Sequence, residues 1–262
     1  MLDNVLRSFF DVQAMWAVVP DILDHGLRNT LLLSLAATAA GIVLGLLLAV
    51  MGVSRSAWLR VPARVYTDVF RGLPAILTIL LIGQGLAPLT SQWFRGNPYP
   101  LGILALSLIS SAYIGEIFRS GIQSVDAGQL KACRALGMSY ASAMRLVVVP
   151  QGVRRVLPAL VNQFIAIVKD SSLVYFLGLL TTQRELFRVG QDAAVTSGNL
   201  SPLVAVGICY LIITVPLTYL VNWTDQRLRT GGRVAAVLDA DAEARAAEIE
   251  RSDREVAERA GR

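Results

Sequence analysis

The chain has 262 residues, of which 54% are hydrophobic and 16% are charged, with a formal net charge of +5. A soluble domain of this length usually carries more charge, so the composition predicts an integral membrane protein. The basic excess comes without the aromatic–basic pattern of a nucleic-acid binder, and we expect no nucleic-acid partner.

Residues 1–25 mix apolar and acidic side chains, and we expect them to form a short helix on the outer face. The opening MLDNVLRSFFDVQ lacks the basic region and apolar core of a cleaved signal peptide, so the first span is expected to serve as the insertion signal. His25 lies just before that span, where a solvated interfacial histidine is the simplest interpretation.

Four uncharged runs are long enough for a helix to cross a hydrocarbon core of about 30 Å at about 1.5 Å per residue. They are residues 29–54, 72–94, 96–115 and 193–224. A fifth crossing joins the uncharged runs 156–168 and 171–183 across Lys169 and Asp170, and would hold an ion pair inside it. The predicted fold class is all-α, an integral membrane helical bundle of about five transmembrane helices.

Three short patterns predict how these spans begin, end and pack. Gly41 and Gly45 lie four residues apart, which offers a small surface for another helix, and packing within the chain is the favoured interpretation. The motif RGLP at 71–74 predicts a helix start, because the first-turn N–H that proline lacks is unpaired anyway. Glu116 and Arg119 are three residues apart and can pair on one helix face.

The basic residues predict the orientation of the spans. The two loops at 55–71 and 116–155 hold four and six Lys and Arg residues, whereas the opposite side holds five in all. By the positive-inside rule, the N-terminus lies outside and the C-terminus lies in the cytoplasm. In the tail, residues 226–262, the stretch 239–262 alternates acidic, basic and alanine residues without an apolar stripe. It reads as a solvated appendage, with a regulatory contact as the alternative.

The cytoplasmic loop at 126–150 has the strongest local order. Asp126 can cap a helix over residues 127–136, and Gly137 can end that helix in the left-handed conformation. Small residues such as Ala132 and Ala135 let another backbone approach the helix closely.

A second short helix follows in the same loop. Ser139 can cap a helix over residues 140–148, which Pro150 would close, and Pro158 would then start the fourth span. A helix that only rests on a membrane would need bulky apolar anchors, and these are few. The loop therefore predicts a docking element.

The chain shows no pattern for catalysis. The phosphate-binding motif GxxxxGK[ST] is absent, and no histidine, paired-carboxylate or nucleophile constellation occurs, so we expect no enzyme activity, catalytic residue or cofactor on this chain. Cys133 lies in a cytoplasmic loop and Cys209 inside the last span, which supports neither a disulfide nor a metal site.

Several motifs together resemble the permease subunits of type I ATP-binding-cassette (ABC) importers, and most closely the polar amino acid permeases. The core of the resemblance is QLKACRALG at 129–137, followed by Pro150-Gln151, Leu157-Pro158, Asn162 and KDSSL at 169–173. RGLPA at 71–75 and AYIGEIFRSGIQSV at 112–125 support it. Each string alone is weak, but the combination is specific.

The resemblance implies a type I ABC importer permease (MetI-like) fold over residues 26–225, between the outer segment 1–25 and the tail. It implies a bacterial cytoplasmic-membrane protein that imports amino acids, polar or charged ones, by ATP-driven alternating access. The implied partners are two ABC ATPase subunits that bind ATP and Mg²⁺, a second permease subunit (identical or homologous), an extracytoplasmic solute-binding protein and membrane lipid.

The motifs and the positions of the charges suggest roles for individual residues. Coupling to the ATPase would involve Gln129, Lys131, Ala132, Cys133, Leu136, Gly137 and Pro150. The substrate path would involve Lys169, Asp170, Ser171 and Ser172. Structural or gating roles would fall to Arg71, Gly72, Pro74, Glu116, Arg119 and Asn162.

One departure from the family pattern concerns the docking surface. The family's loop usually has Glu-Ala-Ala where this chain has Lys131-Ala132-Cys133, which reverses a charge. Either the ATPase groove is altered to match, or a second permease keeps the acid.

Lys169 lies 14 residues beyond Arg155, which is about 21 Å along a helix and past mid-membrane. A lone lysine near the bilayer centre costs about 2.5–3.5 kcal/mol, and such groups usually face a bundle interior or an aqueous path. A zwitterionic amino acid needs both charge signs nearby. The alternative is a structural ion pair that fixes helix packing or a subunit contact.

Two other function classes remain open. A self-sufficient channel or secondary transporter would often show inverted repeats, and none is visible. A membrane scaffold or sensor would use the charged tail to recruit soluble proteins. Within the importer hypothesis, methionine-type amino acids and opine-like derivatives are the runner-up substrates.

Overall fold

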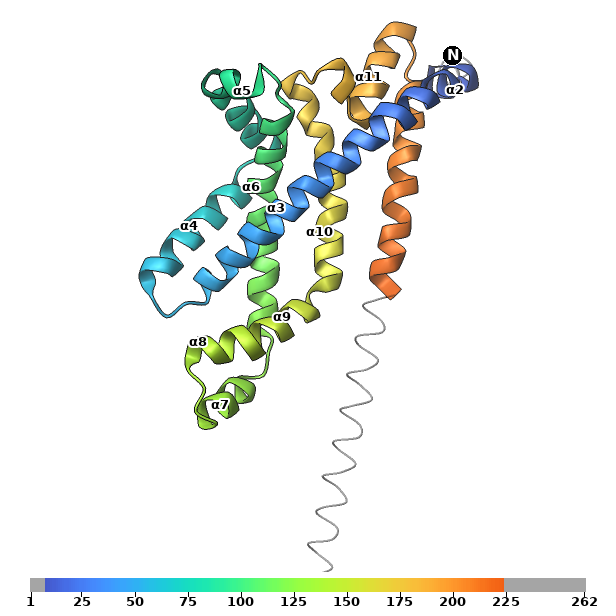
Figure 1. Ribbon diagram of the computed structural model, residues 1–262. Helices are drawn as coiled ribbons and strands as arrows, with labels where there is room; N and C mark the ends of the chain where they lie inside the picture. The colour runs from blue at the N-terminus through green and yellow to red at the C-terminus, as the bar shows by residue number, and fades with distance from the viewer. Residues whose placement is uncertain (1–7, 224–262) are drawn as a thin grey trace, which may run out of the picture. The chain divides into compact units, whose positions relative to one another are not determined.

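The computed structural model describes residues 8–223, and the predicted tail at 226–262 lies outside them (Figure 1). The described residues form helices and turns without a strand, which confirms the predicted all-α class. Four of their helices are long and apolar enough to cross a membrane, and a bent helix pair would make a fifth span if it crosses as one. The four are Val12–Gly52, Tyr99–Gln123, Leu157–Leu177 and Ser201–Trp223.

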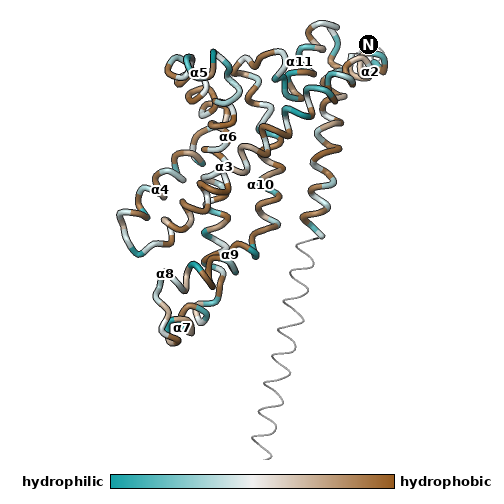
Figure 2. Tube along the Cα trace, viewed as in Figure 1, coloured by the Kyte–Doolittle hydropathy of each residue, from teal (hydrophilic) through white to brown (hydrophobic). Residues whose placement is uncertain are grey.

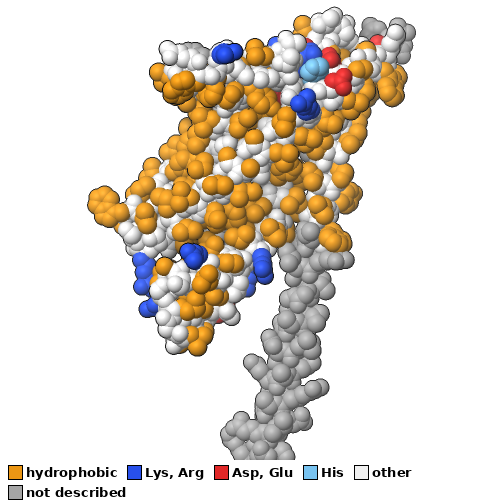
Figure 3. All heavy atoms as spheres, viewed as in Figure 1, with side chains coloured by type: hydrophobic (Ala, Val, Ile, Leu, Met, Phe, Trp, Pro, Cys, Tyr) orange, Lys and Arg blue, Asp and Glu red, His pale blue; other side chains and the backbone are white. Residues whose placement is uncertain are grey.

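The exposed surface of this helical unit has the pattern of a protein embedded in lipid. On the face shown in Figure 3, hydrophobic side chains form a broad band, and Lys and Arg side chains gather at its two ends. Hydrophobic residues also dominate α3 along most of its length (Figure 2). An apolar exposed band of this kind is stable in hydrocarbon and would be a liability in water.

The N-terminal helix does not end before the first span. Helix α2 (Val12–Asp21) begins at Asp11, whose carboxylate accepts hydrogen bonds from the backbone N–H groups of Gln13 and Ala14. It then continues through the wider turn of η1 (Ile22–Leu27) into α3 (Arg28–Gly52). Such a π-type turn lets a helix adjust locally without ending, so the expected separate outer helix is part of one 41-residue helix.

Helix α3 crosses α6 (Tyr99–Gln123) at the two predicted glycines. A Cβ atom at Gly45 would lie 2.8 Å from Cγ2 of Ile114 and 2.9 Å from the backbone nitrogen of Gly115. The Ser110 hydroxyl donates a hydrogen bond of 3.2 Å to the Ala37 carbonyl across the same crossing. The small-residue surface therefore packs within the chain, which confirms the favoured interpretation.

The segment expected to be a loop between the first two spans is instead helix α4 (Ala57–Gly72). Its arginines suggested a loop, but they share the helix with exposed apolar residues, and this mixture is what an amphipathic helix requires. Leu73 has an extended backbone, as expected for a residue before proline, and Pro74 caps α5 (Ala75–Phe94). The predicted helix start at RGLP is confirmed. However, α4 and α5 meet at 105°, so residues 72–94 are not an independent straight crossing.

Three short helical pieces follow α6. They are α7 (Ala127–Ala135), α8 (Tyr140–Ala143) with the wider turn η2 (Met144–Val148), and α9 (Val149–Arg155). The prediction that Pro150 closes the second helix is wrong, because the helix runs on to Arg155. The π-type turn of η2 directly precedes Pro150 and provides the local adjustment that a proline needs inside a helix.

The next span begins at Pro158, as predicted, in α10 (Leu157–Asp170), and it continues as the 3₁₀ helix η3 (Ser171–Leu177). Gly178 ends it with φ +71°, so the crossing stops before the predicted residue 183. After the short turn η4 (Thr181–Gln183), α11 (Leu186–Ser197) leads to the last helix, Ser201–Trp223.

The start of α11 holds a buried acid. Glu185 is fully buried, and its carboxylate accepts hydrogen bonds of 2.6 Å from the backbone N–H groups of both Phe187 and Arg188. The Tyr210 hydroxyl lies 3.4 Å from it. Burial raises the pKa of Glu185 to about 7, although the two backbone donors pull it down.

We expect the stability of the protein to fall as the pH rises from about 4.5 to about 7. In this window the folded state keeps the Glu185 proton, whereas the unfolded state has released it. The free energy of unfolding therefore falls by about 1.4 kcal/mol per pH unit, or about 3 kcal/mol over the whole window. Unfolding temperatures in detergent across this range would measure the effect. Glu185→Gln resembles the protonated acid and should flatten the profile, whereas an unchanged pH dependence in this variant would assign it to another group.

Candidate functional site

The first element of the site is α7, and hydrogen bonds cap this helix at both ends. The Asp126 carboxylate accepts a hydrogen bond from the backbone N–H of Gly128. At the other end Gly137 has φ +84°, its N–H donates to the Arg134 carbonyl, and the Met138 N–H donates to the Cys133 carbonyl. These two bonds form a Schellman motif, so the predicted cap and the predicted left-handed stop are both confirmed.

Most of the predicted coupling residues lie on the surface of α7. Gln129, Lys131 and Ala132 are exposed, and Leu136 is 84% exposed at the helix end. Cys133 points the other way and is buried. The exposed residues of α7 therefore combine polar, basic and small side chains with one large apolar side chain at the helix end.

The second element is the connection from α9 back to α6. A Cβ atom at Gly121 would lie 2.6 Å from the Gly152 carbonyl oxygen, and one at Gly152 would lie 2.8 Å from the backbone nitrogen of Ile122. Arg155 also donates a hydrogen bond to the Ser124 carbonyl. Because the two backbones touch, α9 cannot shift toward α6 without displacing it. The sequence analysis missed this contact, because neither glycine lay in a helix that it predicted.

Pro150 lies at the surface in the first turn of α9. It belongs to the piece that connects α7 to α6, and it does not mark the end of the loop. Ser139 caps α8 as predicted, through a hydrogen bond of 3.1 Å from the Ser142 N–H to its hydroxyl.

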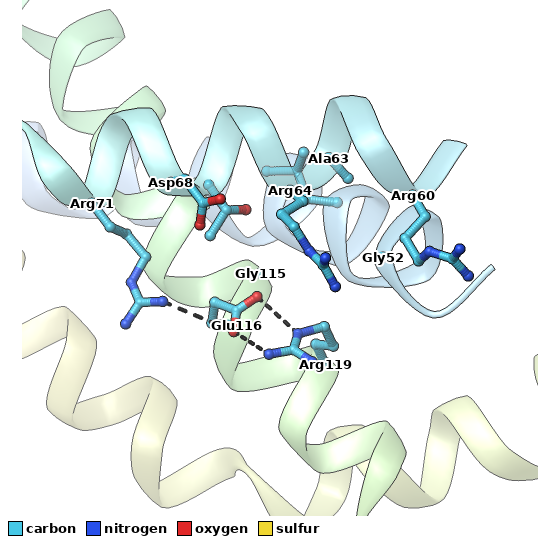
Figure 4. A pocket seen from close by; sticks show the side chains of 11 residues that line it. Gly52, Arg60, Ala63, Arg64, Asp68, Arg71, Gly115, Glu116 and Arg119 are labelled. Carbon is cyan, nitrogen blue, oxygen red and sulfur yellow. Dashed lines mark hydrogen bonds and ion pairs between the residues drawn. The ribbon is translucent and has the colours of Figure 1, made fainter. Parts of the chain in front are cut away.

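A third element is an arginine–glutamate cluster where α4 meets α6 (Figure 4). Arg119 binds Glu116 with two hydrogen bonds of 2.8 and 2.5 Å, which confirms the predicted pair. Arg71 reaches the same carboxylate at 3.9 Å and stacks over the Tyr113 ring at 5.4 Å. The predicted structural residues of α4 and α6 therefore meet at one acid.

Gly72 and Pro74 lie next to this cluster, at the bend between α4 and α5. Asn162 lies elsewhere, on α10. It is exposed, as is Lys169 seven residues later, so the two share one exposed face of the helix.

The other predicted substrate-path residues do not all share that face. Ser171 is fully buried, and its hydroxyl donates a hydrogen bond of 2.8 Å to the Val168 carbonyl. Asp170 is partly buried, and Ser172 donates to the Lys169 carbonyl at 2.7 Å. The expected ion pair between Lys169 and Asp170 is not among the salt bridges of the described residues. Adjacent helical residues point about 100° apart, which separates the two charges.

Comparisons with known proteins cover most of the chain. Residues 41–230 match the family described as binding-protein-dependent transport system inner membrane component. The arginine transport system permease protein ArtQ of Bacillus subtilis is 33% identical over 220 residues, which cover 84% of this chain and 98% of ArtQ. The glutamine transport system permease protein GlnP of Escherichia coli is 34% identical over 226 residues, with the same two coverages.

Solved structures share the arrangement of helices. An amino acid ABC transporter crystallised with histidines has a TM-score of 0.71 and 33% identity, and the match covers 83% of this chain and 98% of that one. An inward-facing MetNI methionine ABC transporter has a TM-score of 0.63 at 21% identity, and the match covers 78% of this chain and 92% of that one, a likeness of fold.

Proposed function

Because the chain belongs to the family of binding-protein-dependent transport system inner membrane components, we propose that it forms the amino acid pathway of an ATP-driven ABC importer. It is a multi-pass protein of the cytoplasmic membrane and a permease subunit, and the family's ATPase activity resides in a separate subunit. Polar or charged amino acids are the proposed substrates. The relatives named for arginine and glutamine transport support this choice.

The observation that carries the proposal is the construction of α7 to α9. An exposed leucine and lysine lie on α7, which is capped at both ends, and α9 contacts α6 backbone to backbone. A surface element can transmit force only if its attachment is stiff. α6 in turn packs closely on α3, so displacement of α7 would move both long helices and switch the pathway between inward-open and outward-open states.

This proposal places the partners and the orientation. α7 would dock in a groove of an ATPase, with two ATPases serving two permease subunits, so the α7–α9 end would be cytoplasmic. The N-terminus would then lie outside, together with the α11 end, where an extracytoplasmic solute-binding protein would deliver the substrate. The basic residues of the α4 and α7–α9 regions support this orientation.

Residues 126–155, which we call the docking segment, are strongly basic. They hold one acid, Asp126, and five cations: Lys131, Arg134, Arg145, Arg154 and Arg155. A groove that receives α7 would be complementary if it were acidic, or a homologous second permease would supply the acid that Lys131 replaces.

We place the substrate path along the exposed face of α10. Lys169 would attract the substrate carboxylate, Asn162 would offer a neutral hydrogen-bonding group, and the partly buried Asp170 would lie close to the amino group. Ser172 adjoins them, whereas the buried Ser171 would act only by holding the start of η3. A polar exposed face on a membrane helix normally faces water or a partner subunit.

Lys169→Met is expected to lower the rate of amino acid uptake by about 10- to 100-fold, the equivalent of one charge-assisted hydrogen bond. Assembly with the ATPase should be unchanged, because Lys169 lies at the end of α10 and the opposite end of that helix follows α9. Uptake into vesicles and co-purification of the ATPase would measure the two effects separately. Lys169→Arg should retain part of the uptake. Loss of assembly in Lys169→Met would instead indicate a structural or subunit contact.

The function itself is tested by purifying the tagged chain with its partners and reconstituting it in liposomes. Uptake of a polar amino acid that requires ATP, the co-purified ATPase and a solute-binding protein would support the proposal. Uptake by the chain alone, driven by an ion gradient without ATP, would replace it with a secondary transporter or channel.

A further inference from the structure

Two adjoining cavities between α4, α6 and α7–α9 form one groove, which we call the arginine groove. The cavity shown in Figure 4 has a volume of about 560 Å³, and its neighbour has about 980 Å³. They share the lining residues Arg60, Arg64 and Arg119, together with Gly52. The second cavity reaches Leu130 and Tyr140 in the docking segment.

The groove holds more positive charge than its own acids balance. Four guanidinium groups line the first cavity, from Arg60, Arg64, Arg71 and Arg119, against the carboxylates of Asp68 and Glu116. Two of the four already share Glu116.

Among the described residues, the two remaining arginines form no direct ion pair with an acid, and Arg64 interacts with the Glu116 charge only at longer range. Arg60 donates a hydrogen bond of 3.4 Å to the Ser54 carbonyl, and neither Arg60 nor Arg64 takes part in a salt bridge among the described residues. In the second cavity the added acid is Asp126, one of whose oxygens already caps α7. Two adjacent guanidinium groups in a cavity favour an anion with several acceptor oxygens, since guanidinium binds phosphate in a two-pronged geometry.

The groove lies at the level where two membrane spans end. The first span ends at Gly52 and the second long span, α6, ends at Gln123, and both residues line the second cavity. Val53 and Ser54, which directly follow the first span, line it as well. Ends of apolar spans mark the boundary between hydrocarbon and headgroups, so the arginines are at headgroup depth.

Apolar residues on α4 flank the arginines. Trp58 is 90% exposed, and Val61, Val65 and Val69 recur at intervals of three or four residues with about half of each side chain exposed. A soluble anion would gain nothing from this surface, whereas acyl chains would cover it. Basic pockets between helices at the cytoplasmic side of a membrane are typical sites for anionic lipid headgroups.

We propose that the arginine groove binds one anionic glycerophospholipid. Its phosphate contacts Arg60 and Arg64, with Arg119 at the wall, and its acyl chains follow the apolar face of α4. The bound lipid links α4 to α6 beside the docking segment and neutralises the surplus charge. This site is independent of the transported solute, so it stands or falls separately from the proposed function.

The test compares two lipids of equal chain length on the full chain, purified with the subunits that accompany it. Dioleoyl phosphatidylglycerol carries a net negative charge and dioleoyl phosphatidylcholine does not. Native mass spectrometry counts the lipids retained by each protein. We expect phosphatidylglycerol to be retained about tenfold better than phosphatidylcholine, because one charge-assisted hydrogen bond changes an affinity by about this factor.

Arg60→Gln/Arg64→Gln should reduce this preference to near unity. Arg145→Gln removes one positive charge, as Arg64→Gln alone does, from an exposed helical residue outside both cavities, and it should keep the preference. Should the double variant not fold, the single Arg64→Gln variant, at an exposed position, should still lower the ratio.

Three results would overturn the proposal. Equal retention of both lipids would show that the site does not recognise the charge of the lipid. If Arg145→Gln lowered the preference as much as Arg64→Gln does, the net charge of the protein would explain the preference. Millimolar inorganic phosphate that displaces phosphatidylglycerol completely would identify a soluble-anion site instead of a lipid site.

Discussion

Gly45→Leu is expected to prevent the chain from folding. At Gly45 the backbone of α3 lies against α6, and any added Cβ atom meets Ile114 and the backbone nitrogen of Gly115 at less than 3 Å. Gly115 is tightly packed as well, because its own Cβ position is 3.3 Å from the Gly45 carbonyl oxygen. A side chain can rotate away from such a clash, but a helix backbone cannot.

The energy involved is large compared with the stability of a domain. Overpacking a core by a few methylene groups costs about 1–3 kcal/mol when side chains can adjust. Here the two helices must separate, and this exposes the crossing at which Ser110 and Ile114 of α6 are buried. With a total stability of about 5–15 kcal/mol, the loss should leave little folded protein.

Size-exclusion chromatography of the detergent-solubilised protein would measure this result. The matched control is Gly207→Leu, since Gly207 also lies in a membrane-spanning helix but has no atom within 4 Å of its Cβ position. The control should elute as a single folded species. Equal recovery of both variants would mean that the α3–α6 crossing tolerates separation.

Patterns that depend on neighbouring residues were predictable from the sequence. The glycine pair of α3, the Asp126 cap and the Glu116–Arg119 pair all involve residues within one turn of a helix, where geometry follows directly from spacing. The same holds for Gly137, whose left-handed conformation needs no tertiary contact.

Helix α4 was not predicted because its charges outweighed its periodicity. Arginines at 55, 60, 64 and 71 resemble a cytoplasmic loop, and Pro62 strengthens that impression. The apolar residues on the other face become informative only once a helix is assumed. The amphipathic pattern is therefore present in the sequence, but it competes with a stronger topological signal.

Other features depend on residues far away in the chain. Glu185 is buried because Tyr210 and α11 enclose it, and the Thr30 hydroxyl accepts a hydrogen bond from the Leu186 N–H, 156 residues away. The contact between Gly121 and Gly152 likewise depends on how α9 folds back, which the wider turn before Pro150 decides. No local pattern contains this information.

Gly137→Val is expected to abolish ATP-driven uptake while leaving the transmembrane helices intact. With φ +84°, residue 137 lies in a region that costs an L-amino acid about 1–2 kcal/mol, and more for a β-branched side chain. α7 has only nine residues and cannot hold its shape alone. Valine would break the Schellman motif and release Leu136 and Lys131 from a fixed position.

The matched variant is Gly137→Asn, because asparagine tolerates the left-handed conformation and the site has no atom within 4 Å of a Cβ. If conformation is the requirement, asparagine should retain ATPase binding and uptake, whereas valine should lose both at unchanged protein levels. Equal losses in the two variants would mean that α7 needs a bare backbone at this point, as a direct contact with the ATPase would require. Two folded variants with full uptake would show that force reaches α6 by a route other than α7.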